Sequence, residues 1–379
     1  NLVYGFGYTQ VLQEQDGIHK TMDIFVPRED TIKIQYITLE NTTEEEKEID
    51  ISYRIEPVLG VTQEINLQYI LCKQEENAIL LKNPYSIEFS NCTSFVTVVG
   101  QSDATHVQWN TDHYSVTLHS NLKAKGKETF AIILGCSENQ GAYFRQIQEK
   151  YNEKDAILKE LDETKIYWEK KVTNSMQTGD VYLDIMANGW LLYQTIVCRL
   201  YARSAFYQSG GALGYRDQLQ DTLALIDSWP ERTREQIVLH ASKQFEKGDV
   251  LHWWHPHNNA GIRTYFSDDY LWLPYVLAEY VERTKDYSVL EVEMPYLEDK
   301  PMGNQREMYD VFSQIDKKDS VYIHAKLAIQ YSLSRIHPTN GLLDIGDGDW
   351  NDGFSNIRGQ SVWLTFFMMA ILDKFTVLA

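Results

Sequence analysis

An acidic, glycine-rich segment carries the most conspicuous chemistry of this sequence. It covers residues 341–354 and has the sequence Gly-Leu-Leu-Asp-Ile-Gly-Asp-Gly-Asp-Trp-Asn-Asp-Gly-Phe. Four aspartates within nine residues are costly to bury without partners, and the glycines permit a tight backbone path. Trp350 can pack on a sugar ring while a neighbouring carboxyl reaches the glycosidic oxygen. Because carboxylates that crowd one another hold their protons more tightly, the segment predicts a proton donor beside an aromatic platform.

Two other interpretations of this segment are a cation site and a solvated acidic turn. Counted from Asp347, an EF-hand loop requires glycine at the sixth position and glutamate at the twelfth, where this sequence has Asp352 and Arg358. An EF-hand is therefore excluded. A looser cation site and a solvated turn stay as alternatives, and we predict no bound metal.

A second polar segment, residues 208–221, has the sequence Gln-Ser-Gly-Gly-Ala-Leu-Gly-Tyr-Arg-Asp-Gln-Leu-Gln-Asp. Its glycines predict a loop into a helix that starts near Asp217, with Gln220 and Asp221 on the same face and Arg216 just before. Charge-assisted hydrogen bonds from such groups suit sugar hydroxyls. The alternative is that Asp217 caps the helix and pairs with Arg216. No Gly-Lys-Ser/Thr follows the glycines, which excludes a phosphate-binding P-loop.

A third segment, residues 252–270, begins His-Trp-Trp-His-Pro-His. The spacing of its three histidines matches no standard zinc site. Ser267 predicts a helix N-cap, followed by Asp268 and Asp269 in the first turn, where the helix dipole favours acidic residues. The remaining aromatic and basic residues are interpreted as part of a cleft wall: Trp253, Trp254 and Arg263.

The elements that must position these segments change in type along the chain. Residues 1–135 consist of short β-branched runs separated by turns, which predicts a sandwich of antiparallel strands. The alternation of Ile32, Ile34, Tyr36 and Thr38 predicts a strand with one buried and one wet face.

Helical periodicity replaces the strand pattern from about residue 139. Residues 141–172 are rich in Glu and Lys with apolar residues three and four apart, which predicts one or two amphipathic linker helices. Beyond about residue 180 we predict helices joined by polar loops, with no strands between them; a bundle, a solenoid or a helical toroid would fit. The predicted helices cover residues 181–207, 217–228, 231–246, 268–285, 304–315, 319–336 and 360–379.

Composition excludes several classes of function. Acidic residues outnumber basic ones by 54 to 35, and the net charge of −19 argues against binding nucleic acid. The sequence contains no apolar run of about 18 residues, so no membrane span is predicted. The sequence contains no Gly-x-Ser-x-Gly or dinucleotide-binding fingerprint, so acyl transfer and hydride transfer are poor candidates.

The length and the cysteines add further expectations. A chain of 379 residues suggests two or more domains. It starts at Asn1 in predicted β structure and ends inside an apolar stretch, so we expect a piece of a longer protein. The cysteines lack zinc-ligand spacing and lie mostly among apolar neighbours, which predicts reduced, buried thiols and a cytoplasmic protein: Cys72, Cys92, Cys136 and Cys198.

The three polar segments together resemble glycoside hydrolase family 94, which includes cellobiose, cellodextrin, laminaribiose and chitobiose phosphorylases and a domain of cyclic β-1,2-glucan synthases. The matching stretches are GGALGYRDQLQD, HWWHP with GIRTYFSDDYLWLP, and GDWNDG followed by SVWL. The resemblance implies an α+β multidomain fold: an antiparallel β-sandwich at residues 1–138, a helical linker at 139–178, and the first part of an (α/α)₆ barrel at 179–379.

The resemblance also assigns roles to residues. The last aspartate of the DWND motif is the family's general acid, which implies Asp352. Trp350, Arg216 and Asp217 are implied to hold the glucosyl unit that is transferred. Some family members specific for disaccharides carry an arginine where this sequence has Gly211, so their specificity does not transfer. The other residues expected to bind substrate are Asn351, Gln220, Arg263, Asp268 and Asp269.

The implied reaction is reversible, inverting phosphorolysis of a β-glucoside to an α-sugar 1-phosphate, with inorganic phosphate in place of the water of an inverting glycosidase. The expected partners are a disaccharide or oligosaccharide and phosphate, without a further cofactor, nucleic acid or membrane; family members often form homodimers. The family's phosphate-binding residues correspond to positions downstream of residue 379. Two alternatives stay open: an inverting β-glycoside hydrolase on the same barrel, and a non-catalytic carbohydrate-binding protein.

Overall fold

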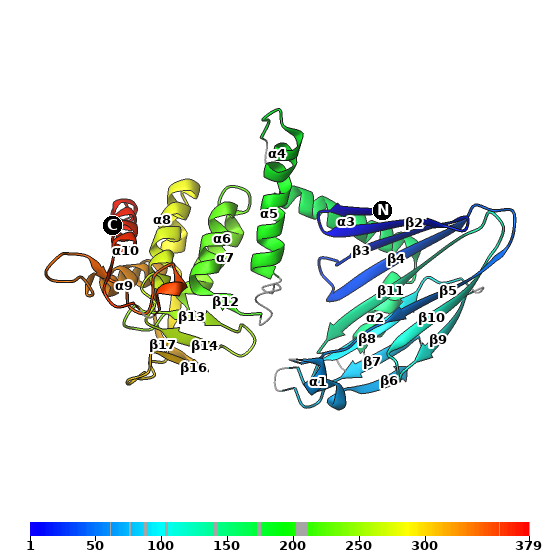
Figure 1. The fold of residues 1–379 in the computed structure, drawn as a ribbon, viewed down its shortest axis with the longest axis horizontal. Coiled ribbons are helices and arrows are strands. Elements are labelled where there is room, and N and C mark those ends of the chain that lie inside the picture. The colour runs from blue at the N-terminus through cyan, green and yellow to red at the C-terminus, as the bar shows by residue number, and fades with distance from the viewer. Residues whose placement is uncertain are drawn as a thin grey trace. The chain divides into compact units, whose positions relative to one another are not determined.

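The computed structural model consists of two compact units, Asn1–Lys170 and Lys171–Ala379, which are described separately (Figure 1). The predicted boundary after residue 138 adjoins positions outside the described ranges and stays a prediction, as does the boundary after residue 178. The structure describes residues 1–60, 62–75, 77–86, 89–102, 105–138, 142–172, 176–201, 211–355 and 357–378.

The first unit contains the predicted antiparallel strands, arranged in two sheets. The larger sheet has the order β1-β2-β3-β4-β11-β8-β7-β6, and the smaller has the order β5-β10-β9. A short helix, α1 (Gln63–Asn66), precedes β6. The strands are β1 (Leu2–Gly5), β2 (Tyr8–Gln15), β3 (Ile18–Phe25), β4 (Ile32–Asn41), β5 (Lys47–Arg54), β6 (Leu71–Glu75), β7 (Ala78–Lys82), β8 (Thr93–Val99), β9 (Thr105–Asn110), β10 (Ser115–Leu122) and β11 (Lys127–Ser137).

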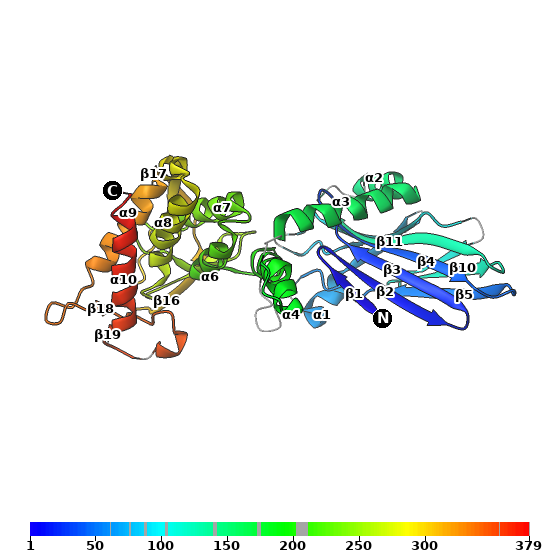
Figure 2. The same ribbon diagram turned by 90° about the horizontal axis from the view of Figure 1, so that it is seen from above.

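Both faces of the larger sheet are covered. On one face, Ile34 belongs to a buried cluster with residues of α2 (Ala142–Tyr151) and α3 (Lys154–Val172), which run along the sheet in Figure 2. On the other face, Leu39 packs with residues of the smaller sheet such as Leu118. The predicted wet face of the strand at residues 32–38 is therefore wrong, because helices and a second sheet cover opposite sides of β4.

The predicted amphipathic helices form as α2 and α3. Their apolar residues Ile147, Tyr151, Ile157 and Leu161 are all buried in the cluster against the larger sheet. The three-and-four spacing of these residues places them on one stripe of each helix, which is what a sheet surface requires.

The predicted burial of the cysteines is wrong. All four thiols are free, as expected, but Cys72 and Cys92 are half-buried and Cys136 and Cys198 are exposed. Cys136 lies near the end of β11, on the same face as the buried Phe130 and Ile132 but at an exposed position. Apolar neighbours in the sequence therefore did not indicate an apolar environment in space.

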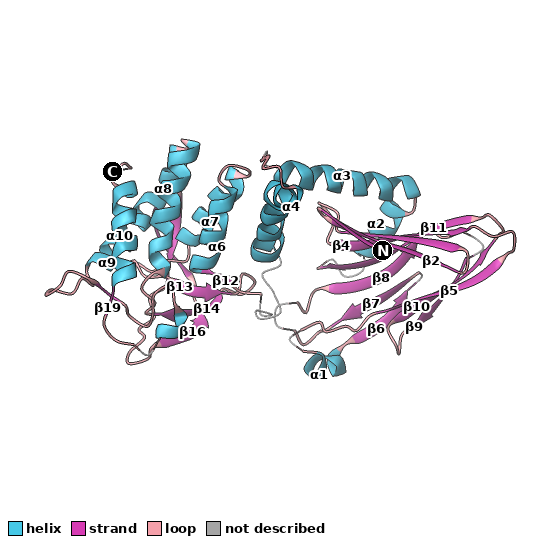
Figure 3. Ribbon diagram, turned by 45° about the horizontal axis from the view of Figure 1, so that its top comes forward, coloured by secondary structure: helices cyan, strands magenta, loops and turns pink. Residues whose placement is uncertain are grey.

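The second unit is built mainly from helices around one hydrophobic cluster (Figure 3). Helix α8 contacts α6, α7, α9 and α10, so it lies at the centre of this core. No helix in the described ranges is long and apolar enough to cross a membrane. The helices are α4 (Val181–Ile185), α5 (Leu191–Gln194), α6 (Tyr215–Thr222), α7 (Pro230–Ala241), α8 (Trp272–Thr284), α9 (Val321–Leu333) and α10 (Val362–Phe375), and helical segments Met186–Trp190 and Thr195–Tyr201 flank α5.

Strands also occur between these helices, contrary to the prediction. β12, β13, β14 and β16 form one sheet, and β15 pairs with β17. The helix predicted at residues 304–315 is wrong, since β16 pairs with β14 there. Such pairing depends on a partner far along the chain and overrides local periodicity. The strands are β12 (Leu213–Gly214), β13 (Leu251–Trp254), β14 (Ala260–Thr264), β15 (Glu293–Leu297), β16 (Glu307–Val311), β17 (Gln314–Ser320), β18 (Leu343–Asp344) and β19 (Gln360–Ser361).

The other predicted helices exist with shifted ends. The predicted helix at 231–246 ends at Ala241, with Ser242 as its C-cap. The predicted helix at 217–228 begins earlier, at Tyr215, and becomes a 3₁₀ turn at Leu223–Leu225. The last part of the helix predicted at 181–207 lies outside the described residues.

Candidate active site

Arg216 joins three separate segments of the second unit. Its side chain is buried on α6, and its Nη1 donates hydrogen bonds to Asp268 Oδ1 at 2.9 Å and to the Asp349 carbonyl oxygen at 2.8 Å. Its Nη2 donates to Oδ1 of Asp352. The structure therefore brings together residues predicted from all three polar sequence segments at one guanidinium.

Several carboxylates share this single cation. Burial opposes the charge of Arg216, but Asp268, Asp269 and Asp352 outweigh it and raise the pKa of the guanidinium. Asp268 and Asp269 are both buried, with Asp269 Oδ1 lying 3.9 Å from Arg216 Nε. Burial and the neighbouring Asp269 charge raise the pKa of Asp268, while Arg216 opposes the shift. The arrangement makes Arg216 a fixed counter-charge for the whole group.

The loop that carries Asp352 is shaped by a close backbone contact and by its own aspartates. Gly346 has a φ of +66°, and a Cβ there would lie 2.1 Å from the Tyr265 carbonyl oxygen, so only glycine fits. Asp349 accepts hydrogen bonds from the Asn351 backbone N–H at 3.0 Å and from Ser361 Oγ at 2.6 Å. Asp347 accepts from Arg306 Nε at 2.8 Å. Two of the four aspartates are therefore structural.

Trp350, Asn351 and Asp352 are consecutive exposed residues of the loop. Trp350 is 55 % exposed and the Asp352 side chain is 64 % exposed, whereas Asp347 and Asp349 are buried. Asn351 Oδ1 accepts a hydrogen bond from the Gly353 N–H at 2.9 Å and starts the 3₁₀ turn η7 (Asp352–Phe354). The contact of Asp352 is a guanidinium rather than the crowding carboxylate that the sequence suggested. This turn presents an aromatic face and a carboxyl together to solvent.

Asp217 occupies a different environment from Arg216. It lies 3.5 Å from Arg199 Nη2, and Asp221 accepts a hydrogen bond from Arg199 Nε at 2.8 Å. The alternative in which Asp217 caps the helix and pairs with Arg216 is wrong, since the capping position is Gly214. Gln220 is half-buried on the same helix. Residues 208–210 of this motif lie outside the described residues.

The three residues of the predicted cleft wall, Trp253, Trp254 and Arg263, lie in three different environments. Trp254 is 1 % exposed and packs edge-on against Tyr215 at 6.4 Å, so it is a core residue and that part of the prediction is wrong. Trp253 is half-buried, with its ring 5.7 Å from that of Tyr309.

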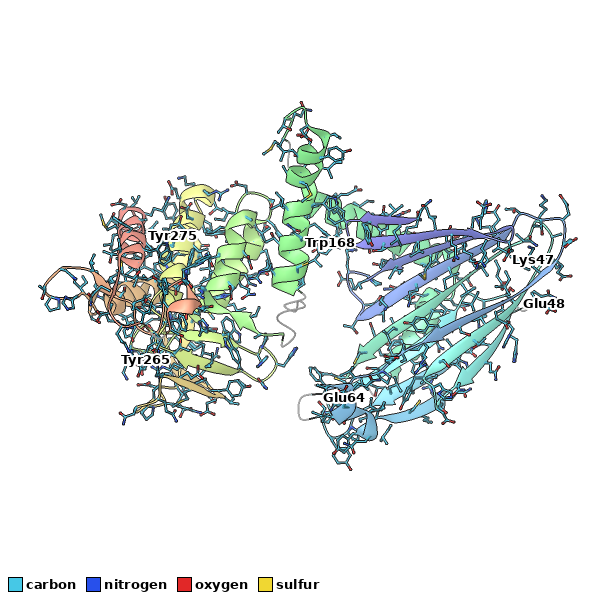
Figure 4. All side chains as sticks on the ribbon, in the orientation of Figure 1. Lys47, Glu48, Glu64, Trp168, Tyr265 and Tyr275 are labelled. Atoms are coloured by element: carbon cyan, nitrogen blue, oxygen red, sulfur yellow. The ribbon has the colours of Figure 1, made fainter. Side chains whose placement is uncertain are left out.

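Arg263 is buried in a separate network. It donates to Asp249 and to Asp299, each at 2.7 Å. These residues line a cavity of about 100 Å³ together with Tyr265, which Figure 4 labels, and neither Arg216 nor Asp352 lines it. The structure therefore does not bring Arg263 to the guanidinium of Arg216.

Ser267 is not the predicted N-cap. Its Oγ donates to the Gly348 carbonyl oxygen at 3.0 Å and so ties this segment to the acidic loop. The following 3₁₀ turn, η5 (Asp269–Leu271), has Asp268 at the capping position without a capping hydrogen bond, because Asp268 accepts from Arg216 and from Trp272 Nε1. The two acidic residues are used for tertiary contacts rather than for the helix end.

His252 is a neighbour of this group that the sequence prediction missed. Its Nδ1 lies 2.7 Å from Asp269 Oδ2, and its ring stacks on Phe266 at 4.6 Å with an interplanar angle of 10°. The histidine spacing suggests at most a zinc site, and among the described residues no group of three or more His, Cys, Asp or Glu side chains is placed to hold a metal ion. The place of His252 in a polar segment was the available signal, but its partner Asp269 lies 17 positions further along the chain.

Comparison with known proteins identifies the family. Residues 167–379 match the model described as the glycosyl hydrolase 94 superfamily catalytic domain, and residues 1–115 match the glycosyl hydrolase 94 supersandwich domain. The chain belongs to glycosyl hydrolase family 94, as its three motifs predicted.

Individual relatives extend this result. The chain is 30 % identical over 409 residues to the cyclic β-(1,2)-glucan synthase NdvB of Rhizobium meliloti (strain 1021), covering 98 % of this chain and 14 % of that protein. It is 22 % identical over 439 residues to an N,N′-diacetylchitobiose phosphorylase of Vibrio furnissii, covering 99 % of this chain and 52 % of the relative. The chain thus spans about half of that phosphorylase and a small part of the synthase.

A solved structure supports the fold. A putative kojibiose phosphorylase from the human microbiome superposes with a TM-score of 0.55 at 12 % identity, covering 98 % of this chain and 50 % of that one. The predicted fold class, a β-sandwich followed by a helical domain, is confirmed.

Proposed function

We propose that this chain is part of an inverting glycoside phosphorylase in which Asp352 is the general acid. The observation that carries the proposal is the pairing of the exposed Asp352 with the buried Arg216, next to the exposed ring of Trp350, in a chain of family 94. A proton donor needs solvent access to reach a substrate, and it needs a fixed orientation; the loop and the guanidinium supply both.

In the proposed reaction, protonated Asp352 donates its proton to the glycosidic oxygen as the bond from that oxygen to C1 breaks. A phosphate oxygen forms the new bond to C1 from the opposite face, which yields an α-sugar 1-phosphate. Phosphate is already anionic, so no protein base is required. Arg216 then stabilises the carboxylate that the transfer leaves on Asp352.

The other site residues take two kinds of role in this proposal. Trp350 and Asn351 are exposed beside the acid and contact the sugar. Asp268 and Asp269 are buried and hold Arg216 in place rather than touching the sugar.

Asp217 and Gln220 are proposed to bind the glucosyl unit from α6, since both side chains are partly exposed. The contact of Arg263 with substrate stays a prediction, because its guanidinium is bonded to Asp249 and Asp299.

We propose a β-1,2-linked glucoside as the first substrate to test. The support is the match to a cyclic β-(1,2)-glucan synthase over 98 % of this chain. The phosphorylase relatives act on other saccharides according to their names, so the linkage is a separate question from the reaction type.

The test incubates the full-length enzyme that carries this chain with β-1,2-, β-1,3- and β-1,4-linked glucose disaccharides and N,N′-diacetylchitobiose, with and without inorganic phosphate. Phosphate-dependent release of sugar 1-phosphate supports the proposal. Phosphate-independent release of free sugar would indicate a hydrolase instead, and binding without turnover a carbohydrate-binding protein.

Asp352→Asn should abolish turnover of these glucosides, by about 10²-fold or more, because the amide cannot donate the required proton. Circular dichroism and thermal unfolding should stay unchanged, since Asp352 is exposed. Asp373→Asn, an exposed aspartate on α10, is the matched control and should keep full activity. Retained activity in Asp352→Asn would place the acid elsewhere.

A further inference from the structure

His252 lies at an irregularity of the sheet in the second unit. β13 and β14 pair Leu251 with Arg263 and Trp253 with Ile262, so His252 is the additional residue of a β-bulge. Bulges redirect a side chain and are enriched next to active sites. The bulge therefore takes the His252 side chain out of the regular alternation of the strand, in which Leu251 and Trp254 are buried.

The imidazole is held by a hydrogen bond on one edge and by a ring on one face. Nδ1 lies 2.7 Å from Asp269 Oδ2, and the ring stacks on Phe266 at 4.6 Å. Asp269 is 2 % exposed, while the His252 side chain keeps 20 % exposure. Within the described part of the chain, no residue forms a hydrogen bond with Nε2. The free nitrogen is therefore on the edge opposite Asp269.

The surroundings connect His252 to the candidate acid. The Asp269 carboxylate lies between His252 Nδ1 and Arg216 Nε, and Arg216 in turn holds Asp352. Burial opposes a charge on the ring, yet Asp269 and Asp352 outweigh burial and Arg216, so the pKa of His252 lies above its usual value. A fixed imidazole with one edge unbonded among the described residues, within electrostatic range of Asp352, is suited to hydrogen-bond a ligand.

We propose that His252 binds a saccharide oxygen through Nε2, with Asp269 as the residue that orients the ring. This inference rests on the proposed function. An inverting displacement places the nucleophile on the face of the sugar opposite the acid. Asp352 acts electrostatically on His252, so we assign the partner of His252 as a hydroxyl of the saccharide held at the acid rather than the incoming phosphate.

Two substitutions separate this role from a structural one. In His252→Asn, the amide nitrogen can occupy the place of Nδ1 and keep the bond to Asp269, but Nε2 is lost. In His252→Gln, the longer side chain can place its amide nitrogen near the position of Nε2. Steady-state kinetics of the full-length enzyme would give kcat and KM for the disaccharide and for phosphate.

The expected result is a KM for the disaccharide raised roughly 10- to 100-fold in His252→Asn, with the KM for phosphate unchanged. His252→Gln should recover most of the saccharide affinity. A structural role predicts the reverse order, with Asn tolerated and Gln impaired, and that order would overturn the inference. If the unaltered enzyme shows no phosphate-dependent turnover, the proposed function fails instead.

A measurement on the unaltered enzyme covers the case in which the variants do not fold. Diethylpyrocarbonate acylates the free nitrogen of imidazole, and peptide mass spectrometry reports the rate at His252. Saturating disaccharide should slow this modification at least 10-fold, the expected consequence of a ligand that occupies the free nitrogen, and phosphate alone should not. Protection by phosphate but not by disaccharide, or by neither, would contradict the assignment.

Discussion

Asp349 and Asp352 are three positions apart and have opposite environments. Asp349 is 6 % exposed, and both of its carboxylate oxygens accept hydrogen bonds within the loop or from Ser361. The Asp352 side chain is exposed, and among the described residues its carboxylate meets only the guanidinium of Arg216. A carboxylate whose two oxygens both accept hydrogen bonds inside the protein stabilises a loop, whereas one that is exposed to solvent can react.

Trp350 is the residue where sugar binding should be most directly measurable. Trp350→Ala should weaken saccharide binding by about 1–3 kcal/mol, because a sugar face covering part of the indole buries apolar area worth about 25 cal/mol per Å². Isothermal titration calorimetry with the productive disaccharide would measure the loss. Tyr287→Ala removes another exposed ring of the same unit and should leave the affinity unchanged. Equal affinity in Trp350→Ala would make Trp350 a packing residue.

The sequence predicted the residue types of the site but not all of their partners. The motifs placed Arg216, Asp268 and Asp352 in the candidate site, and the structure brings them into contact. The partners of Arg216 are 52 and 136 positions away, so local patterns could not reveal which carboxylate it binds. His252 was missed for the same reason, since its role depends on a strand pairing and on Asp269.

At the scale of elements, a buried glutamate connects the two sheets of the sandwich. Glu128 on β11 accepts hydrogen bonds from Ser102 at 2.7 Å and from Thr105 and Ser120, which lie on the strands of the smaller sheet. Burial opposes its charge, but these hydrogen bonds outweigh burial and hold the pKa of Glu128 below its usual value.

The sign of the resulting pH dependence follows from that lowered pKa. The contribution of Glu128 to stability is present above the pKa of the unfolded chain and is lost as the pH falls through the lower folded pKa. Glu128→Gln should therefore lower the free energy of unfolding by about 1–3 kcal/mol at pH 7 and by less below about pH 4. Urea unfolding at several pH values would measure this difference. Glu40→Gln, exposed on β4, should show no comparable deficit at pH 7.

Elements with a strong local period were predictable, and those that depend on pairing were not. The apolar stripe of α3 and the strands before residue 138 follow from their own sequences. β16 has only five residues, and its side chains alternate between exposed and half-buried, so no buried face marks it as a strand. Its structure is fixed by the register with β14, in which Tyr309 faces Ile262.

At the scale of the whole molecule, each unit has its own hydrophobic core. Among the described residues, the sandwich unit contains two clusters, one on each face of the larger sheet, and the helical unit contains one cluster centred on α8. Separate cores of this kind allow domains to unfold in separate steps.

Two core substitutions should therefore act on different unfolding transitions. Ile34→Ala and Leu273→Ala each empty a fully buried site and should cost about 2–5 kcal/mol. Calorimetry should show the first variant lowering one transition and the second lowering the other. Leu71→Ala, exposed in the sandwich unit, should leave both midpoints in place. A shared shift of both transitions in either core variant would show that the units unfold together.

The three contacts of Arg216 also fix when the site can come into existence during synthesis. Arg216 is translated 136 residues before Asp352, and the loop that holds Asp352 closes against a segment made in between. Contacts separated by this much sequence form late, after the entropy of closing long loops has been overcome. A nascent chain therefore carries its binding residues long before it carries an oriented acid, and its catalytic geometry is among the last features that it acquires.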